Sequence, residues 1–323
     1  MGQVIVVGSV NADYTVRIGH LPQPGETVTG GRLEILPGGK GGNQAHAAAR
    51  LDAQVTLVAA VGEDATGEQA LADLQAAGID TSGLIRDSGP SGVAVILVDA
   101  AGENMIAVAP GGNERLTAGR VSELLAGRVT AGTVLLASLE VPLAAVSAAG
   151  AAAAGVDGAV LVVNPAPGRS LPRDLIDGVI LTPNEGELLR LPPPGQSAEA
   201  GADHGATVTS GAAGPDEDAA VGYLLGAGAR AVIVTRGSRG ATLFRARRAP
   251  ADFPAPQVEV VDTVGAGDAF NGALATALAA GLPLETAVTA AVQAGAAACT
   301  GQGARQALPR AADIPALRTT RPA

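Results

Sequence analysis

The chain has no tryptophan, one cysteine and few aromatic residues of any kind. Phe, Trp and Tyr together make up 2% of the 323 residues, which leaves little material for a binding site based on aromatic stacking. A single cysteine, Cys299, excludes an intrachain disulfide, and this fits the reducing environment of the cytoplasm. We expect a core of Ala, Val and Leu in which helices pack closely on a sheet.

Long apolar runs and an excess of positive charge are also missing. Gly, Pro or charged residues interrupt the apolar segments well before the roughly 20 residues that cross a membrane. The first residues, Met1–Gly8, lack the charged segment of a signal peptide. A net charge of −10 disfavours nucleic acids and anionic membranes as partners, because both need a basic face. The prediction is a cytoplasmic protein that binds small molecules.

The chain does contain an alternation of short apolar runs and helical patterns. Hydrophobic residues make up 47% of it, which predicts a packed globular fold. Continuous apolar runs are typical of strands that are buried on both faces of a parallel sheet. They lie at Val4–Val7, Val55–Val61, Val134–Ala137, Ala159–Val163, Val179–Leu181 and Ala231–Thr235. Helical patterns lie at Gly42–Leu51, Gly67–Ala77, Pro142–Ala154, Asn184–Leu189, Pro215–Gly226, Ala266–Ala280 and Leu284–Ala298. The alternation predicts a doubly wound α/β fold.

Two segments, residues 11–36 and 91–110, are strand-like and contain no helical pattern. The first includes a long strand-like run at Glu26–Ile35, and the second is typical of a hairpin that turns at Asp99–Gly102. We expect the two segments to form a small β-sheet that lies as a lid over a site. The remaining parts, residues 1–10, 37–90 and 111–323, would form the main domain, with a flexible surface insertion at 192–215.

The motif that points most directly to chemistry is Asp262-Thr-Val-Gly-Ala-Gly-Asp-Ala-Phe-Asn-Gly272, a Gly-rich turn between a predicted strand, Val258–Val261, and a helix. Its glycines let backbone N–H groups gather around an anion at the helix N-terminus. Such a nest stabilises the charge that spreads over a phosphoryl group during transfer. Asp268 can accept the proton of an attacking hydroxyl, and the helix dipole predicts that it is a weak base. A bare Gly-x-Gly-Asp is more often a helix cap, but the full string favours catalysis.

Two further motifs add polar groups beside Gly-rich turns. Pro37-Gly-Gly-Lys-Gly-Gly-Asn-Gln-Ala45 contains a Gly-rich turn that opens a helix, and its Lys40 and Asn43 supply donors for hydroxyl groups, although the Walker A pattern is absent from the sequence. Gly8-Ser-Val-Asn-Ala-Asp13 follows the first strand, where open α/β sheets bind ligands. Asn11 and Asp13 can bind vicinal hydroxyls. Taken alone, the first motif is equally compatible with an ordinary loop, and the second is more typical of a turn or cap.

Together these motifs resemble those of the ribokinase family of carbohydrate kinases, the PfkB group. The similarity covers nearly the whole chain and continues between the three motifs. The further matching segments are Pro24–Thr27, Gly102–Asn104, Leu139–Pro142, Asn164–Pro167, Thr182–Glu185 and Thr235–Gly240. The resemblance implies a ribokinase-like fold: a doubly wound, mostly parallel sheet flanked by helices, with a small β-sheet lid.

The resemblance also implies a reaction, the ATP-dependent phosphorylation of D-ribose at O5 to ribose 5-phosphate and ADP, with Asp268 as catalytic base. The sugar would be held by Asn11, Asp13, Gly39, Lys40, Gly41, Asn43, Glu140 and Asp268. ATP would be bound by Asn184, Thr235, Arg236, Gly237, Ser238 and Gly240, and by the anion hole at Gly265, Ala266 and Gly267.

Mg²⁺ and a monovalent cation, usually K⁺, are the cofactors that the resemblance implies. Mg²⁺ would lie near Glu187, since it takes oxygen ligands, often through water. K⁺ would be bound by the Asp262 side chain and by the carbonyl groups of Val264, Ala298, Gly301 and Gly303. The family often has a further Ser ligand where this chain has Ala307, and Asn or His near the adenine where this chain has Val292. The resemblance also implies a homodimer in which lid strands of two subunits pair, since an exposed sheet edge invites pairing.

Other functions stay open. The substrate could be deoxyribose, fructose or adenosine, although Asn164-Pro-Ala-Pro167 and the lack of an aromatic-rich lid favour a small sugar over a nucleoside. A non-catalytic sugar- or nucleotide-binding protein is disfavoured by Asp268, Lys40 and Glu187. A dinucleotide dehydrogenase is disfavoured because Gly8-Ser-Val-Asn11 replaces the expected Gly-x-Gly-x-x-Gly.

We assign no chemistry to the three histidines or to the cysteine. His20, His46 and His204 have no metal-ligand spacing. Cys299 lies at the end of an Ala-rich pattern, and we expect it to be a small buried apolar group.

Overall fold

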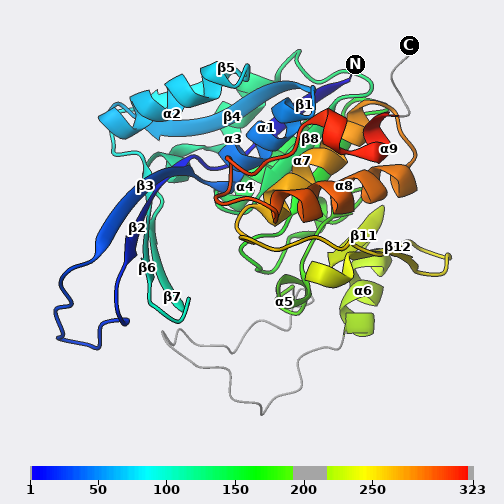
Figure 1. Cartoon of the computed structure of the whole chain (residues 1–323). Helices are drawn as coiled ribbons and strands as arrows, with labels where there is room; N and C mark the ends of the chain where they lie inside the picture. The colour runs from blue at the N-terminus through cyan, green and yellow to red at the C-terminus, as the bar shows by residue number, and fades with distance from the viewer. Residues whose placement is uncertain (1, 192–216, 319–323) are drawn as a thin grey trace.

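The computed structural model describes residues 2–191 and 217–318 and contains two β-sheets (Figure 1). The larger sheet has nine strands in the order β13-β12-β11-β10-β9-β8-β1-β4-β5, and the smaller has four in the order β3-β2-β6-β7. The predicted α/β fold with a small separate sheet is confirmed. The predicted insertion at 192–215 and His204 lie outside the described residues.

The main sheet is parallel from β5 to β11, and β12 and β13 are antiparallel at one edge. Its strands are β1 Gln3–Val7, β4 Gln54–Gly62, β5 Asp80–Asp87, β8 Val134–Ser138, β9 Val160–Asn164, β10 Ile180–Leu181, β11 Ala231–Thr235, β12 Ala241–Phe244 and β13 Ala251–Phe253. Alternate side chains of β1 enter different cores: Val4 and Val6 pack on one face of the sheet, and Ile5 and Val7 pack on the other. The strand is therefore continuously apolar in sequence.

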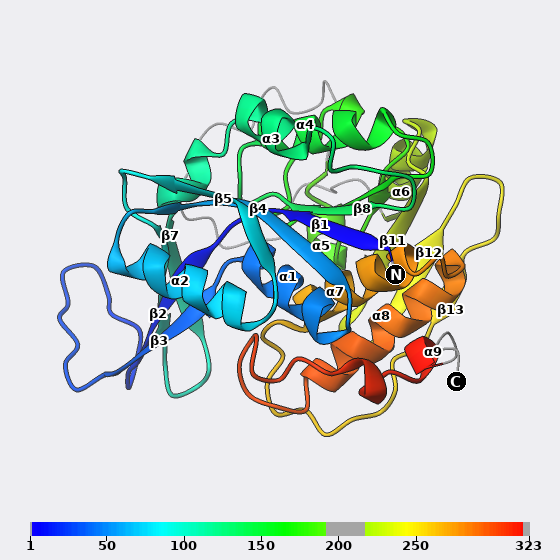
Figure 2. The same ribbon diagram turned by 90° about the horizontal axis from the view of Figure 1, so that it is seen from above.

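Helices cover both faces of this sheet, and Figure 2 shows α3, α4 and α6 on the side opposite to α1, α2, α7 and α8. One layer contains α1 Lys40–Arg50, α2 Ala65–Ala76, α7 Ala266–Ala279, α8 Leu284–Ala298 and α9 Pro315–Arg318. The other contains α3 Ala118–Leu125, α4 Leu143–Ala154, α5 Glu185–Leu188 and α6 Glu217–Gly226. Within the described part of the chain, none of these helices has the length and apolar character needed to span a bilayer.

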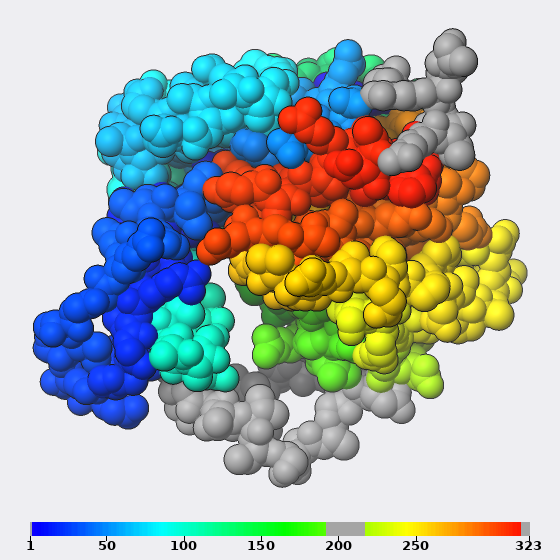
Figure 3. Space-filling view, viewed as in Figure 1, coloured from blue at the N-terminus to red at the C-terminus, as the bar shows by residue number. Residues whose placement is uncertain are grey.

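The smaller sheet stands away from the main body, and the space-filling view shows a hollow between the two (Figure 3). Its strands are β2 Asn11–Arg17, β3 Arg32–Gly38, β6 Gly92–Val98 and β7 Asn104–Ala109. Both predicted lid segments, 11–36 and 91–110, contribute to it. The hairpin turn forms because Asp99 Oδ1 accepts hydrogen bonds from the backbone N–H groups of Ala101 and Glu103, while Gly102 has a φ of 86°.

The predicted strand at Val258–Val261 is absent from the structure. Val260 and Val261 are 60% and 62% exposed, and the backbone N–H of Val261 donates to the Cys299 carbonyl instead of to a neighbouring strand. The predicted run at Glu26–Ile35 becomes a strand only from Arg32, because Glu26 Oε2 accepts the backbone N–H of Gln23 and closes a local turn. The apolar side chains in these two segments are largely exposed and do not pack into the core. Their composition therefore resembles that of a buried strand without the burial that a central strand has.

Several elements escaped prediction. Strand β5 contains five polar or charged side chains on an edge of the sheet, and β12 and β13 are short antiparallel strands at the opposite edge. Edge strands bury less of their surface than central ones, and so they lack the continuous apolar pattern on which the prediction depends.

Helices α1 and α7 pack at very short range. A Cβ on Gly272 of α7 would lie 2.5 Å from Ala47 Cβ and 2.9 Å from the backbone oxygen of Gln44. Only glycine leaves room for this approach, which brings the beginnings of the two helices together.

This contact gives a stability prediction. We expect Gly272→Ala to lower the free energy of unfolding by about 1–3 kcal/mol, because the added methyl group overpacks the helix contact. Gly222→Ala in α6, where a Cβ meets nothing within 4 Å, is the control, and it should stabilise by about 0.5–1 kcal/mol. Urea unfolding of both variants measures the difference. Equal stability of the two variants would contradict the proposed tight contact.

Candidate active site

The candidate site forms where α1 and α7 begin, at the carboxyl ends of the central parallel strands. Asp268 lies in the first turn of α7 and is 7% exposed. Its Oδ2 accepts a hydrogen bond from Asn43 Nδ2, and its Oδ1 accepts one from Gln44 Nε2, both at 3.1 Å. Two Gly-rich motifs that are far apart in the sequence therefore meet around one carboxylate.

Lys40, the first residue of α1, faces the same carboxylate. It is the only lysine in the chain. Burial opposes its charge, but Asp268 and Glu140 hold the pKa of Lys40 above its usual range. Glu140 Oε2 also accepts the backbone N–H of Lys40 at 2.9 Å and the hydroxyl of Ser9 at 2.5 Å. Glu140 thus joins the motif after β1 to the beginning of α1, beside a permanent positive charge.

The predicted polyol ligands Asn11 and Asp13 come from lid strand β2. Asn113 Nδ2 donates to Asn11 Oδ1 at 2.7 Å, and this contact fixes the orientation of the Asn11 amide. Asp13 lies against Gly38, where a Cβ would be 2.1 Å from Asp13 Oδ1. Burial, with a further contribution from Glu140, raises the pKa of Asp13 to about 6. Hydrogen-bonding groups from the lid and from the main body therefore converge on one side of Asp268.

On the other side of Asp268, two cavities meet at the N-terminus of α7. The larger has a volume of about 380 Å³, and the smaller, which is polar, has a volume of about 150 Å³. The larger is lined by Thr235, Gly237, Ser238, Gly240, Ala255, Pro256, Gln257, Val258, Val260, Thr263, Ala266, Gly267, Phe270, Val292, Gly295, Ala296 and Cys299. The smaller is lined by Lys40, Asn164, Ala166, Thr182, Asn184, Glu187, Thr235, Gly265, Gly267, Asp268 and Asn271. Because they share Thr235 and Gly267, one elongated ligand can occupy both.

The turn before α7 depends on glycine. Gly265 has a φ of 81°, in the left-handed region, and a Cβ there would lie 2.7 Å from Ala304 Cα. A Cβ on Gly267 would meet nothing within 4 Å. The first glycine is needed for the backbone turn, and the second leaves the helix N-terminus open to a ligand.

Asn184 and Glu187 face the polar cavity as a reciprocal cap on α5. Asn184 Oδ1 accepts the backbone N–H of Glu187 at 2.7 Å, and Glu187 Oε2 accepts that of Asn184 at 2.9 Å. Burial raises the pKa of Glu187. The described residues contain no group of three or more His, Cys, Asp or Glu that could hold a metal ion. Glu187 fits Mg²⁺ only as one ligand among water and ligand oxygens.

A third cavity, of about 610 Å³, lies beside the polar one and reaches the lid. Val108 of β7 lines it together with Lys40, Glu140, Glu187 and Arg190. The region under the lid is therefore continuous with the polar cavity at the N-terminus of α7, because both are lined by Lys40 and Glu187.

Comparison with known proteins decides the family. The model of the pfkB family carbohydrate kinases matches residues 1–311. The chain belongs to this family. A ribokinase of Haemophilus influenzae is 33% identical and covers 94% of both chains, and one of Schizosaccharomyces pombe is 34% identical and covers 97% of both. The predicted carbohydrate kinase is confirmed.

Solved structures agree with this assignment. The ribokinase of Thermotoga maritima has a TM-score of 0.83 and 30% identity over 99% of this chain and 100% of that one. The ribokinase of Arabidopsis thaliana, solved with ribose and ATP, has a TM-score of 0.81 and 29% identity over 98% of both chains. These neighbours share the ribokinase fold with this carbohydrate kinase.

The electrostatics of Asp268 differ from the sequence-based expectation of a weak base. Burial raises the pKa of Asp268, although the charge of Lys40 and the amides of Asn43 and Gln44 act in the opposite direction. Loss of hydration therefore outweighs the charge of Lys40 and the two amide donors. A carboxylate with a raised pKa accepts a proton more readily than the sequence suggested.

Three of the predicted monovalent-cation residues, Asp262, Val264 and Gly303, are joined by hydrogen bonds in this kinase. Asp262 Oδ1 accepts the backbone N–H of Val264 at 3.0 Å, and its Oδ2 accepts that of Gly303 at 2.9 Å. Ala298 is the last residue of α8, and a Cβ on Gly301 would lie 3.0 Å from Ala307 Cβ. One carboxylate thus joins the turn before α7 to the loop after α8.

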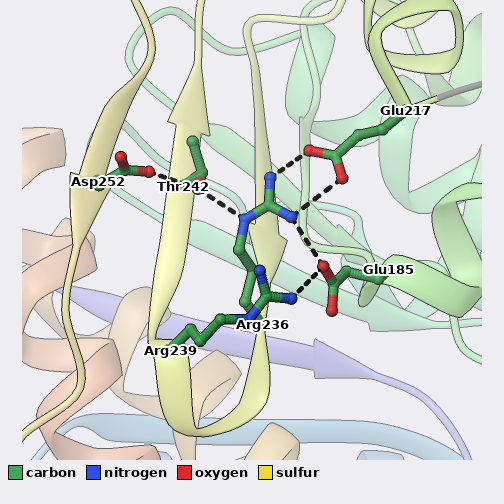
Figure 4. A network of polar contacts seen from close by, with 6 residues as sticks. All are labelled: Glu185, Glu217, Arg236, Arg239, Thr242 and Asp252. Atoms are coloured by element: carbon green, nitrogen blue, oxygen red, sulfur yellow. Dashed lines mark hydrogen bonds and ion pairs between the residues drawn. The ribbon is translucent and has the colours of Figure 1, made fainter.

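Arg236 was predicted to bind the nucleotide, but in the structure its side chain contacts other residues of the protein and does not line the apolar cavity (Figure 4). Its guanidinium contacts Glu217 and Glu185, at 2.9 Å for Glu185 Oε1, and its Nε donates to Thr242 Oγ1 at 2.8 Å. Arg239 also contacts Glu185. These ion pairs join the turn after β11 to α5 and α6. Only the neighbours Thr235, Gly237, Ser238 and Gly240 line the apolar cavity.

Four polar residues that the sequence did not single out complete the site: Ser9, Gln44, Asn113 and Arg305. Arg305 follows α8, and its guanidinium donates to Asn43 Oδ1 at 2.8 Å and to the Gly38 carbonyl at 2.9 Å. Ser9 and Gln44 lie inside the two motifs that the sequence analysis identified, so their position next to predicted site residues could have indicated their role. Asn113 and Arg305 carry no local pattern. Cys299, expected to be buried, caps α8, is half-buried and lines the apolar cavity.

The raised pKa of Asp13 gives a second stability prediction. Its pKa rises from 3.8 to about 6 on folding, so the native state binds the proton more tightly and stability falls as pH rises between these values. We expect Asp13→Asn to stabilise the protein by about 1–3 kcal/mol near pH 7.5 and by little near pH 4. Urea unfolding at the two pH values measures this, with the exposed Asp157→Asn as control. If Asp13→Asn were destabilised near pH 7.5, the ionised Asp13 carboxylate would not lower the free energy of unfolding, and the prediction would be wrong.

Proposed function

We propose that this kinase transfers the γ-phosphoryl group of ATP to O5 of D-ribose, giving ribose 5-phosphate and ADP. The observation that carries the proposal is the position of Asp268. Its buried carboxylate separates a cleft of hydroxyl-binding groups under the lid from a polar cavity at a glycine-rich helix N-terminus. The ribokinases that this chain resembles over almost their entire length, one of them solved with ribose and ATP, support the choice of substrates.

Asp268 acts as the catalytic base in this proposal. It accepts the proton of the O5 hydroxyl as O5 forms a bond to the γ-phosphorus and the bond to the leaving ADP oxygen breaks. Asn43 and Gln44 hold the two carboxylate oxygens by hydrogen bonds and so fix the direction in which the base faces. The raised pKa of Asp268 makes the transfer of the proton more favourable.

Positive charge and backbone N–H groups stabilise the moving phosphoryl group. Gly265, Ala266 and Gly267 supply the anion hole at the start of α7, and Lys40 supplies a charge beside it. The adenosine part occupies the apolar cavity, where Val292 and Phe270 provide apolar contacts. Mg²⁺ neutralises phosphate charge when bound, and Glu187 and Asn184 are the residues placed to hold it through oxygen ligands and water.

A monovalent cation would occupy the loops around Asp262. The Asp262 carboxylate and the carbonyl groups of Val264, Ala298, Gly301 and Gly303 are the proposed ligands. The hydrogen bonds from Val264 and Gly303 to Asp262 support this grouping, since they bring the two loops together beneath the anion hole. An ion there would fix the shape of the Gly265 turn.

The lid would cover the sugar. We propose that residues 11–36 and 91–110 move as one unit relative to the described parts of the main domain, residues 2–10, 37–90, 111–191 and 217–318. Asn11 and Asp13 on β2, together with Gly39, Gly41, Asn43 and Glu140 on the main body, would bind the hydroxyl groups. The cavity that joins Val108 of the lid to Lys40 and Glu140 supports this arrangement.

ADP release with a panel of sugars tests the proposal. We expect turnover with D-ribose to exceed that with deoxyribose, fructose and adenosine, and to rise when K⁺ is added. Asp268→Asn should lower kcat by at least about 100-fold, since a positioned base contributes that much. Asp218→Asn, an exposed carboxylate in the first turn of α6, is the matched control and should retain full activity.

Each alternative gives a different result in this assay. Preference for another sugar or for adenosine would replace ribose as the substrate but keep the mechanism. Undiminished turnover in Asp268→Asn would remove Asp268 as the base. Ribose binding without any ADP release would instead support a non-catalytic binding protein.

We also propose a homodimer in which the outer faces of two lids meet. Strand register places Asp13, Ala94 and Val108 on the face that lines the cavity. The opposite face carries apolar side chains of which several are strongly exposed. These are Leu33 at 54%, Ile35 at 56%, Val95 at 44% and Met105 at 51%. A continuous exposed apolar face of this kind supports association.

Replacement of one residue on this face tests the dimer. Ile35→Asp places a charge in the proposed contact and should convert the protein to a monomer in sedimentation velocity. Leu189→Asp, which introduces the same charge at the 48% exposed C-cap of α5, should leave the mass unchanged. A wild-type protein that sediments as a monomer would exclude the dimer.

A further inference from the structure

Arg305 is an almost completely buried arginine that the proposed mechanism does not use. It is 9% exposed and lies in the loop after α8, far in sequence from the motifs of the site. Burial lowers the pKa of Arg305 to about 10, which leaves it positively charged at neutral pH. A buried charge is costly unless its partners compensate for the lost hydration. Its contacts therefore indicate what the residue does.

The guanidinium contacts two groups at the start of α1. Nε donates to Asn43 Oδ1 at 2.8 Å, and Nη2 donates to the carbonyl of Gly38 at 2.9 Å. A Cβ on Gly42 would lie 2.5 Å from Nη2, so the glycine leaves the space that the guanidinium fills. Gly38 ends lid strand β3, and Asn43 belongs to the first turn of α1. Arg305 thus holds both sides of the turn that is proposed to bind the sugar.

The contact with Asn43 determines how Asn43 meets the base. Arginine can only donate hydrogen bonds, and an ionised carboxylate can only accept them. Asn43 lies between the two, with Oδ1 toward Arg305 and Nδ2 toward Asp268 Oδ2 at 3.1 Å. Rotation of the amide by half a turn would place oxygen against the carboxylate and NH₂ against the guanidinium. Arg305 therefore fixes the one orientation in which Asn43 is a donor to Asp268.

Gln44, the second donor to Asp268, is oriented by a different partner, Asn164, and not by Arg305. Its Nε2 donates to Asp268 Oδ1 and to Asn164 Oδ1, and its buried Oε1 has no hydrogen-bond partner among the described residues. Arg305 therefore acts on Asp268 only through Asn43, and the contact of Gln44 with Asp268 Oδ1 is independent of it.

The loop that carries Arg305 also contacts the phosphate side of the site. The backbone N–H of Gly303 donates to Asp262, and Ala304 lies against Gly265, where a Cβ would be 2.7 Å from Ala304 Cα. The loop thus touches the turn before α7 through Gly303 and Ala304, and the start of α1 through Arg305.

We propose that Arg305 is a positioning residue, which acts through Asn43 to hold Asp268 in its catalytic orientation and through Gly38 to fix the sugar-binding turn. This inference rests on the proposed role of Asp268. Arg305 touches neither the sugar nor the phosphoryl group. Its contribution should therefore appear in kcat by way of Asn43, and in the KM for the sugar by way of Gly38, while the KM for ATP stays the same.

A double-mutant cycle tests the inference. Arg305→Met keeps an unbranched side chain but removes the guanidinium and with it both donors, and it should lower kcat by about 10- to 100-fold, the usual effect of losing a charged hydrogen bond. The KM for ATP should change by less than about twofold. In an Asn43→Ala background, Arg305→Met should lower kcat by no more than about twofold further, because the two residues act as a unit. Arg305→Lys should recover part of kcat, since one donor and the charge remain.

Arg50→Met is the matched control. Arg50 Nη2 donates to the carbonyl of Leu308 at 2.9 Å and so holds the same loop without reaching Asn43. It should reduce thermal stability and leave kcat within about twofold of the wild type. If Arg50→Met and Arg305→Met lowered kcat equally, Arg305 would only stabilise the loop and the inference would be wrong.

The same set of variants separates the inference from the function on which it rests. A wild-type kcat in Arg305→Met, or losses that multiply fully in the double variant, would overturn the role of Arg305 while Asp268→Asn stays inactive. Full turnover in Asp268→Asn would overturn the proposed base, and the role of Arg305 would fall with it.

Discussion

Two helices that begin within hydrogen-bonding distance of one carboxylate hold this site together. The approach of α7 to α1 is possible because Gly272 presents no side chain to Ala47 and Gln44. It brings the amides of Asn43 and Gln44 onto Asp268 from one helix while Asp268 itself comes from the other. Both helices start from glycine-rich turns, so their N–H groups and positive dipole ends face the same volume. The many alanines of α1 and α7 also allow the two helices to approach closely, since larger side chains would keep them apart.

Burial of acidic groups is the cost of this arrangement. Asp13, Glu187 and Asp268 all have a raised pKa, in each case chiefly because burial removes water from the carboxylate. Lys40 and Arg305 are the cations that face this acidic group, and both are themselves largely buried. Such a site is less stable than an apolar one of the same size, and it keeps its charges because a polar, charged ligand completes it.

The sequence predicted the central strands and most of the helices of the fold, for a physical reason, although helix α3 was missed. Strands such as β1 and β8 bury both faces and are continuously apolar, and the N-termini of α1 and α7 need glycines whose spacing is visible in the sequence. Edge strands β5, β12 and β13 lack that pattern and were missed. Val258–Val261 has the composition of a strand but pairs with the loop at Cys299, and only the tertiary structure reveals this. Asn113 and Arg305 could not be found in the same way, because their roles depend on contacts across more than a hundred positions. The sequence also could not predict that the pKa of Asp268 is raised, because burial is a property of the folded chain.

The position of Lys40 has a practical consequence for handling this protein. Every other basic side chain apart from the histidines is an arginine, so the only side-chain amine in the chain stands at the start of α1, where it lines the polar cavity. Reagents that couple to lysine side chains include many dyes, crosslinkers and surface-immobilisation chemistries. In this protein they can react with no lysine outside the cleft. Attachment through an engineered cysteine on the exposed surface would avoid the cleft only if Cys299, which is half-buried and lines the apolar cavity, is first replaced.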